Sequence, residues 1–237
     1  SVLDGIWSDT RSAQAEAFRS LRASIRLLGR DKDRPVTLFT SALPGEGKTF
    51  VSSNYAMALA YQGQRTLLVD ADLRKPNVSP TFFGEHRKPG LADCLLEDLD
   101  LKDVVNPSGV EGLDILTAGS RLPNPGELLA ADGIGGLIAY ASESYDRIVI
   151  DTAPVLSVSD TLLLGHLAHN YCLVIQAGET SRKAILRSIK LVGETGVKVN
   201  GAVLNQLPLG KSSYYSHYYG GYYGGDKVYG SDDTRKG

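Results

Sequence analysis

The residues best suited to chemistry form a short glycine-containing run in the first quarter of the chain. Residues 42–49 read Ala-Leu-Pro-Gly-Glu-Gly-Lys-Thr, and they depart from the phosphate-binding pattern G-x-x-x-x-G-K-[ST] only in having Ala42 at the first glycine. In such a loop, backbone amides surround phosphate oxygens, Lys48 reaches the β- and γ-phosphates, and the Thr49 hydroxyl binds Mg²⁺. The pattern predicts a nucleotide site made of Pro44, Gly45, Glu46, Gly47, Lys48, Thr49 and Phe50.

Two further runs place carboxylates directly after apolar segments. Residues 66–74 read Thr-Leu-Leu-Val-Asp-Ala-Asp-Leu-Arg, with Asp70 and Asp72 two positions apart, and Asp151 ends the apolar part of residues 147–154. At the carboxyl end of a parallel sheet, such carboxylates can coordinate Mg²⁺ through water or accept a proton. Each run alone also fits a solvated turn. The three motifs in this order indicate one shared site for phosphate and metal.

The elements that position these residues follow from hydrophobic periodicity. Six short apolar runs are predicted strands: 36–40, 66–69, 113–116, 147–150, 172–176 and 197–204. Five predicted helices alternate with them: 48–61, 91–98, 126–142, 159–168 and 182–193. This alternation is typical of βαβ units, so we predict an α/β fold, a three-layer αβα P-loop NTPase with a mostly parallel sheet. Apart from the helix at 91–98, residues 75–112 contain four prolines and are predicted to form loops.

The two ends of the chain differ from this central region. Residues 12–28 have apolar side chains at spacings of three and four, which predicts a helix capped by Ser12 or Thr10. After Leu209 the chain holds seven of its 12 tyrosines and no Leu, Ile or Phe, so it buries too little surface to offset its ordering entropy. We therefore expect an N-terminal segment at 1–34, a P-loop domain at 35–207 and a disordered tail at 208–237.

Composition argues against several other classes of protein. The formal charge of −2, from 25 basic and 27 acidic residues, provides no general attraction to nucleic acid or to an anionic membrane. Cys94 and Cys172 match neither a disulfide framework nor the spacing of a zinc site. No apolar run approaches the length of a transmembrane helix. Because the chain begins at Ser1 without Met or a signal peptide, we expect it to be a piece of a longer protein.

The three motifs, together with the terminal tyrosines, resemble one family, the bacterial protein-tyrosine kinases (BY-kinases). The resemblance extends from about residue 15 to the tail, and the run VDADLR and the tyrosine cluster are its most specific parts. It implies a tyrosine autokinase that uses ATP and Mg²⁺, with Asp70 as a candidate base for the attacking phenol. The implied catalytic residues are Lys48, Asp70, Asp72 and Asp151. Thr49, Asp72 and Asp151 would hold Mg²⁺, and Asn205 matches a position that contacts adenine in related ATPases.

The same resemblance implies a substrate and an assembly. The phosphoacceptors would be the tail tyrosines: Tyr214, Tyr215, Tyr218, Tyr219, Tyr222, Tyr223 and Tyr229. The E-x-x-R-x-x-R assembly motif of the family reads Glu16, Arg19 and Arg22 here, on one face of the predicted helix. It implies a homo-oligomeric ring, expected to be an octamer, in which the tail is phosphorylated in trans.

The family also implies a cellular context. BY-kinases act in the synthesis and export of capsular or extracellular polysaccharides, at the cytoplasmic face of the bacterial inner membrane. They work with a transmembrane activator, fused or separate, and a tyrosine phosphatase is expected to reverse the modification. No nucleic-acid partner is expected.

Two other functions stay open from the sequence. Partition and division-site ATPases share this subclass of P-loop, but they carry a lysine at the position of Leu43 and often end in a membrane helix. A nucleotide-binding pseudo-enzyme with a tyrosine-rich interaction tail is the other alternative. It is less favoured, because Lys48, Thr49 and all three aspartates are present.

Overall fold

A mostly parallel sheet organises the residues that the computed structural model describes, which are 6–9, 12–28, 35–130 and 133–207. Its strands lie in the order β3-β4-β2-β5-β1-β6-β7, and only the pair β3 and β4 is antiparallel. The strands are β1 (Val36–Ser41), β2 (Thr66–Asp70), β3 (Asn106–Pro107), β4 (Leu113–Leu116), β5 (Arg147–Asp151), β6 (Asn170–Gln176) and β7 (Gly201–Asn205). The described residues up to Gln206 belong to one compact unit.

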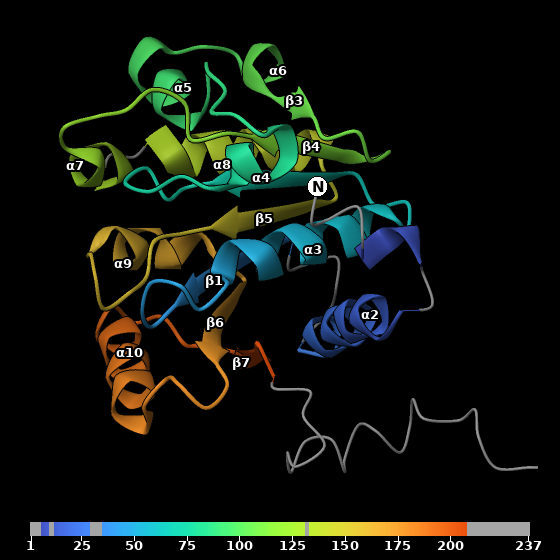
Figure 1. Cartoon of the computed structure of the whole chain (residues 1–237). Coiled ribbons are helices and arrows are strands. Elements are labelled where there is room, and N and C mark those ends of the chain that lie inside the picture. Colours follow the sequence, from blue (N-terminus) through green and yellow to red (C-terminus); the bar gives the residue numbers. More distant parts are fainter. Residues whose placement is uncertain (1–5, 10–11, 29–34, 131–132, 208–237) are drawn as a thin grey trace, which may run out of the picture. The chain divides into compact units, whose positions relative to one another are not determined.

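Helices cover both faces of this sheet (Figure 1). They are α2 (Ala13–Arg26), α3 (Lys48–Ala60), α4 (Val78–Phe83), α5 (Leu91–Glu97), α6 (Leu101–Val104), α7 (Pro125–Ala130), α8 (Gly133–Ser144), α9 (Asp160–Leu164) and α10 (Arg182–Glu194). A 3₁₀ turn, Gly165–Leu167, follows α9. Successive strand side chains point to opposite faces, so Leu67 and Val69 join one core while Leu68 joins the other. The predicted α/β fold with a mostly parallel sheet is confirmed.

The N-terminal helix packs on α3 and extends the core on that face. Ser12 caps α2, because its hydroxyl accepts a hydrogen bond from the amide of Ala15 at 3.1 Å. Phe18 of α2 meets the ring of Phe50 edge-on, with the ring centroids 5.8 Å apart. This cover makes α3 buried on nearly every side from Val51 onward, although it begins at the edge of the sheet.

Three parts of the chain differ from the elements predicted for them. The stretch 75–112 holds α4, α6 and the edge strand β3 besides the expected helix, and Pro107 is tolerated there because an edge strand need not donate on both sides. The helix expected at 126–142 is two helices, α7 and α8. The last strand begins at Gly201 instead of at residue 197, since Asn200 closes the preceding turn with hydrogen bonds to the backbone of Tyr171.

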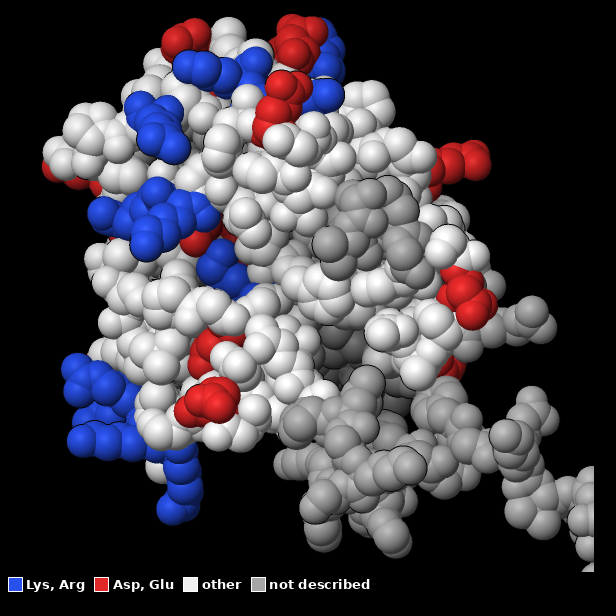
Figure 2. Space-filling model, in the orientation of Figure 1, with Lys and Arg blue, Asp and Glu red and all other residues white. Residues whose placement is uncertain are grey.

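Positive charge is unevenly spread over the surface. Figure 2 shows Lys and Arg side chains gathered where α10 lies in Figure 1. Helix α10 carries four exposed basic residues: Arg182, Lys183, Arg187 and Lys190. The small net charge of the chain therefore conceals a local basic surface. Among the described helices, none is long and apolar enough to cross a membrane.

Candidate active site

The glycine-containing loop joins β1 to α3 at the carboxyl edge of the sheet. Gly45 and Gly47 have φ angles of +86° and +84°, in the left-handed region that glycine adopts without strain. A Cβ atom at Gly47 would also lie 2.2 Å from the side-chain nitrogen of Asn205, so a side chain here would displace Asn205 from the loop. No side chain caps the start of α3 at Lys48. The first amides of α3 are therefore suited to bind an anion such as phosphate.

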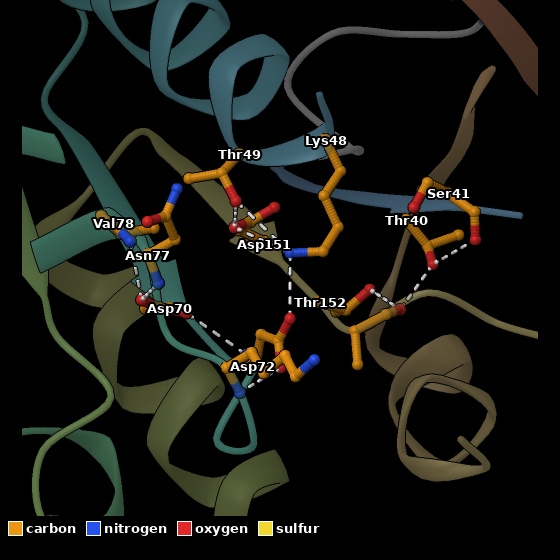
Figure 3. Close-up of polar contacts among 12 residues, drawn as sticks. Thr40, Ser41, Lys48, Thr49, Asp70, Asp72, Asn77, Val78, Asp151 and Thr152 are labelled. Atoms are coloured by element: carbon orange, nitrogen blue, oxygen red, sulfur yellow. Dashed lines mark hydrogen bonds and ion pairs between the residues drawn. The ribbon is translucent and has the colours of Figure 1, made fainter. Parts of the chain in front are cut away.

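Lys48 lies at the centre of the site (Figure 3). Its Nζ atom is 3.0 Å from Oδ2 of Asp72 and 3.6 Å from Oδ2 of Asp151. Burial disfavours the charged ammonium, but the two carboxylates outweigh it, and the pKa of Lys48 is raised. The side chain is therefore a protonated cation at neutral pH, as contact with phosphate oxygens requires.

Asp151 and Thr49 form the part of the site that suits a magnesium ion. The Thr49 hydroxyl donates to Oδ2 of Asp151 at 2.6 Å, and the carboxylate is fully buried. Burial raises the pKa of Asp151, although Lys48 acts in the opposite direction. Its Oδ1 atom has no hydrogen-bond partner among the described residues. A buried acceptor without a partner, beside a hydroxyl, fits a water molecule in the shell of Mg²⁺.

No three His, Cys, Asp or Glu side chains of the described ranges form a metal cage by themselves. A magnesium ion at Thr49 and Asp151 would therefore need ligands from water and from nucleotide phosphates, as hard cations bound with phosphates commonly do. The residues present fit Mg²⁺ that arrives together with a nucleotide.

Asp70 is held differently from the other two aspartates. Its Oδ2 atom accepts hydrogen bonds from the amides of Asn77 at 3.1 Å and Val78 at 2.9 Å, and Oδ1 accepts one from the amide of Asp72 at 3.3 Å. Burial, with the charge of Asp151 as the second cause, raises the pKa of Asp70 to about 8. The carboxylate thus closes the start of α4 and ties down the segment that carries Asp72. These hydrogen bonds do not use every lone pair of the two oxygens, so the expected role of a base stays a prediction.

Asn205 and Phe50 were both predicted to contact the nucleotide. The Asn205 side chain donates from Nδ2 to the carbonyl of Glu46 at 2.9 Å, so it lies against the P-loop. A contact with adenine would then fall to its Oδ1 atom. The ring of Phe50 packs against Phe18, which leaves only the Phe50 backbone amide for a phosphate.

Sequence patterns did not identify several residues that shape the site. Asp160, at the start of α9, binds Arg74 through two contacts, from Nε at 2.6 Å and from Nη2 at 3.0 Å. The side chains of Thr180 and Gln206 bond to the P-loop at Glu46 and Gly45. These partners are 86 or more positions apart in the chain. No local pattern in the sequence indicates such pairs.

The three residues of the predicted assembly motif make two kinds of contact, an ion pair on the surface of α2 and a hydrogen bond to α3. Glu16 and Arg19 form a half-exposed ion pair at 2.7 Å on α2. Arg22 turns toward its own domain and donates to the carbonyl of Ala58, in the last turn of α3, at 2.9 Å. All three residues are partly exposed, so a partner can reach each of them. The predicted phosphoacceptors, from Tyr214 to Tyr229, lie outside the described residues.

Comparisons with known sequences agree with one another. A family model described as an AAA domain matches residues 39–201. Tyrosine-protein kinase YwqD of Bacillus subtilis is 36% identical over 210 residues, which cover 89% of this chain and 88% of that protein. Tyrosine-protein kinase etk of Escherichia coli K12 is 35% identical over 202 residues, which cover 85% of this chain. The chain spans only 28% of the length of etk.

Solved structures give the same result. The kinase domain of Escherichia coli tyrosine kinase ETK has a TM-score of 0.82 at 33% identity, covering 87% of this chain and 81% of that one. The chimerical protein CapA2B2 has a TM-score of 0.81 at 31% identity, covering 88% and 91%. The septum site-determining protein MinD from Pyrococcus horikoshii, complexed with Mg-ADP, has a TM-score of 0.62 at 22% identity, covering 74% and 72%, and shares the fold alone.

Proposed function

The chain belongs to the bacterial tyrosine-protein kinases, the BY-kinases, and from this premise we propose that it transfers the γ-phosphoryl group of ATP to tyrosines of its own C-terminal tail. One observation supports the chemistry above all others. Lys48 lies between the carboxylates of Asp72 and Asp151 at the end of a P-loop whose first helical amides have no side-chain cap. Such a site can neutralise and orient a triphosphate, and this accounts for most of the catalysis in phosphoryl transfer.

Each side chain has a defined task in this proposal. Lys48 binds the β- and γ-phosphate oxygens, and Thr49 and Asp151 hold Mg²⁺, with Asp72 as a further ligand. Bound Mg²⁺ supplies charge neutralisation on the transferred group. The phenol of the acceptor, whose pKa is near 10, needs a neighbouring carboxylate or the cation field to lose its proton. Because backbone amides occupy the carboxylate of Asp70, we assign it the task of holding Asp72 in place.

The proposed acceptors are the seven tail tyrosines, reached in trans within a ring. A glycine-rich segment of about 15–20 residues has an r.m.s. span of roughly 20–25 Å, enough to reach a neighbouring subunit. The pair of Glu16 and Arg19 is the proposed subunit contact, because it is half-exposed on α2. Arg22 can take part as well, because its bond to Ala58 uses only one of the five N–H donors of the guanidinium.

Phosphorylation would change the charge of the tail strongly. Each phosphate adds about −1.5 to −2, so seven would add roughly −10 to −14. Repulsion between such tails would disfavour the ring, so we propose a cycle of assembly, phosphorylation and release, which a tyrosine phosphatase resets. The proposed setting is the cytoplasmic face of the inner membrane, with a transmembrane activator and a role in capsular or extracellular polysaccharide synthesis.

An experiment on Lys48 tests the proposed function directly. The variant Lys48→Met should lose phosphotyrosine signal on an immunoblot, because the cation that binds the triphosphate is absent. Signal that survives this substitution would reject autokinase activity. A Lys48→Met chain with an intact tail, mixed with an active chain truncated after Leu209, separates the two routes of transfer. Phosphotyrosine on the inactive chain supports transfer in trans, and its absence, when the intact active chain is phosphorylated, contradicts it.

A further inference from the structure

The P-loop contains a buried carboxylate, that of Glu46, which is held by donors of the protein. Glu46 is only 3% exposed. Its Oε2 atom accepts a hydrogen bond from the amide of Leu43 at 2.8 Å, across the base of the loop. Its Oε1 atom accepts a short hydrogen bond from the hydroxyl of Thr180, which lies between β6 and α10. Both oxygens are therefore engaged by donors of the protein itself.

Thr180 is in turn fixed to the end of β6. Its hydroxyl oxygen accepts a hydrogen bond from the amide of Gln176 at 2.8 Å, and its own amide donates to the Gln176 carbonyl at 3.1 Å. Because a lone pair of the Thr180 hydroxyl oxygen accepts from the amide of Gln176, the hydroxyl hydrogen is free to donate to Glu46. Gln176 pairs with Asn205 in the register of β6 and β7. The hydrogen bond from Thr180 to Glu46 is therefore anchored to the end of β6 through Gln176.

The end of β7 holds the other side of the same loop. Asn205 donates to the carbonyl of Glu46 at 2.9 Å, and Gln206 donates to the carbonyl of Gly45 at 3.1 Å. In a trans peptide the C=O and N–H groups point in opposite directions. Holding these two carbonyls toward β7 therefore turns the amides of Glu46 and Gly47 to the opposite side, which is the orientation that a phosphate-binding loop needs.

We propose that Glu46, Thr180, Asn205 and Gln206 form a clasp that keeps the P-loop amides aimed at the nucleotide, and that Thr180 is a positioning residue for phosphoryl transfer. The inference rests on the proposed function, and it adds a residue to which no motif points. Glu46 acts through the backbone, since a carboxylate aimed at a triphosphate would repel it. Preorganised amides bind the phosphates without the cost of ordering the loop at each turnover.

Removing the Thr180 hydroxyl tests the clasp. We expect Thr180→Val, which keeps the shape of the side chain, to weaken binding of a fluorescent ATP analogue about tenfold, because the buried carboxylate loses a donor and the loop loosens. Thr180→Ser restores the hydroxyl and should bind within about twofold of the wild type. Ser181→Ala is the matched control: it removes the neighbouring hydroxyl that caps α10 at the amide of Ala184, without touching the P-loop.

A double substitution shows whether Thr180 acts through Glu46. If it does, Glu46→Ala with Thr180→Val should bind no more weakly than Glu46→Ala alone, because the second change removes a contact already lost. The proposal is overturned if Thr180→Val binds the ATP analogue as tightly as the wild type does. It is also overturned if Ser181→Ala loses as much affinity as Thr180→Val. If Glu46→Ala does not fold, the proposal is judged by comparing ATP-analogue binding of Thr180→Val with that of Thr180→Ser. If the wild type binds ATP but forms no phosphotyrosine, the proposed function is contradicted, whereas the binding comparisons still test the clasp.

Discussion

Asp70 and Asp151 have the same sequence pattern and opposite surroundings. Each ends a buried strand, and the two face each other in the register of β2 and β5. Three backbone amides donate to Asp70. Asp151 receives one hydroxyl and lies near the ammonium of Lys48, and its Oδ1 atom has no partner in the described part of the chain. One carboxylate is therefore occupied by the fold, and the other keeps an oxygen available for chemistry.

This difference separates structural from chemical carboxylates. A fully buried carboxylate is costly unless its oxygens are paired, so an oxygen without a partner indicates a ligand that the protein itself does not provide. Asp72 lies between the two cases, with one oxygen on the amide of Lys75 and the other on Lys48. These three environments should give three different effects when the carboxylates are replaced one at a time.

The largest effect is expected at Asp151. Asp151→Asn should reduce the rate of autophosphorylation by at least about 100-fold, because the site loses a charge needed for Mg²⁺ and for Lys48. The melting temperature should change little, since the substitution removes a buried charge that is only partly compensated. Kinase assays measure the rate, and thermal unfolding of the same samples measures the melting temperature. Activity within tenfold of the wild type would contradict the assignment.

A smaller effect is expected at Asp70, and it is a loss of stability instead of a loss of rate. Asp70→Ala leaves three backbone amides without their acceptor, so we expect a loss of about 1–3 kcal/mol in unfolding free energy. For a unit of this size that corresponds to roughly 2–4 °C in melting temperature per kcal/mol. Asp70→Asn keeps one acceptor oxygen and is the matched, milder variant. If Asp70→Ala melts like the wild type but is inactive, Asp70 is a chemical group and the contrast with Asp151 fails.

The smallest effect is expected at Asp93, a residue of α5 that also accepts hydrogen bonds from backbone amides. Its Oδ2 atom accepts from Gly90 at 2.8 Å and Ser120 at 3.0 Å. Burial opposes ionisation, but these hydrogen bonds outweigh it and the pKa of Asp93 is lowered. The stabilisation is therefore present above the unfolded pKa of about 3.9 and is lost as the pH falls below it. Asp93→Asn should cost about 1 kcal/mol at pH 7, because the amide oxygen still accepts the two backbone hydrogen bonds but the charge is lost, and less at pH 3.

Chemical unfolding of both chains at the two pH values measures this dependence. An equal cost at pH 7 and pH 3 would show that the charge of Asp93 is irrelevant. Asp93 then also serves as a control for Asp70: both accept backbone amides, but the neighbouring charge of Asp151 acts only on Asp70. The comparison shows what the charged neighbours add, because Asp151, Lys48 and Asp72 all act on the pKa of Asp70.

The sequence was most informative where a function depends on adjacent residues. The P-loop from Ala42 to Thr49 and the aspartates at the ends of β2 and β5 could be found without coordinates, because a short loop and a strand end have fixed geometry. Helix α4 could not be predicted, since its N-terminus is closed by Asp70, seven and eight positions earlier. The roles assigned to the tail tyrosines stay predictions, because these residues lie outside the described ranges.

The sequence by itself determined the layered α/β fold, the family and the identity of the groups that meet a phosphate. Only the tertiary structure decided how those groups divide their tasks. Whether an aspartate caps a helix or keeps a free oxygen depends on which amides approach it, and those amides come from another part of the chain. Thr180 meets Glu46 across 134 positions for the same reason. Periodicity and motifs describe neighbours in sequence, whereas burial and hydrogen bonding depend on neighbours in space.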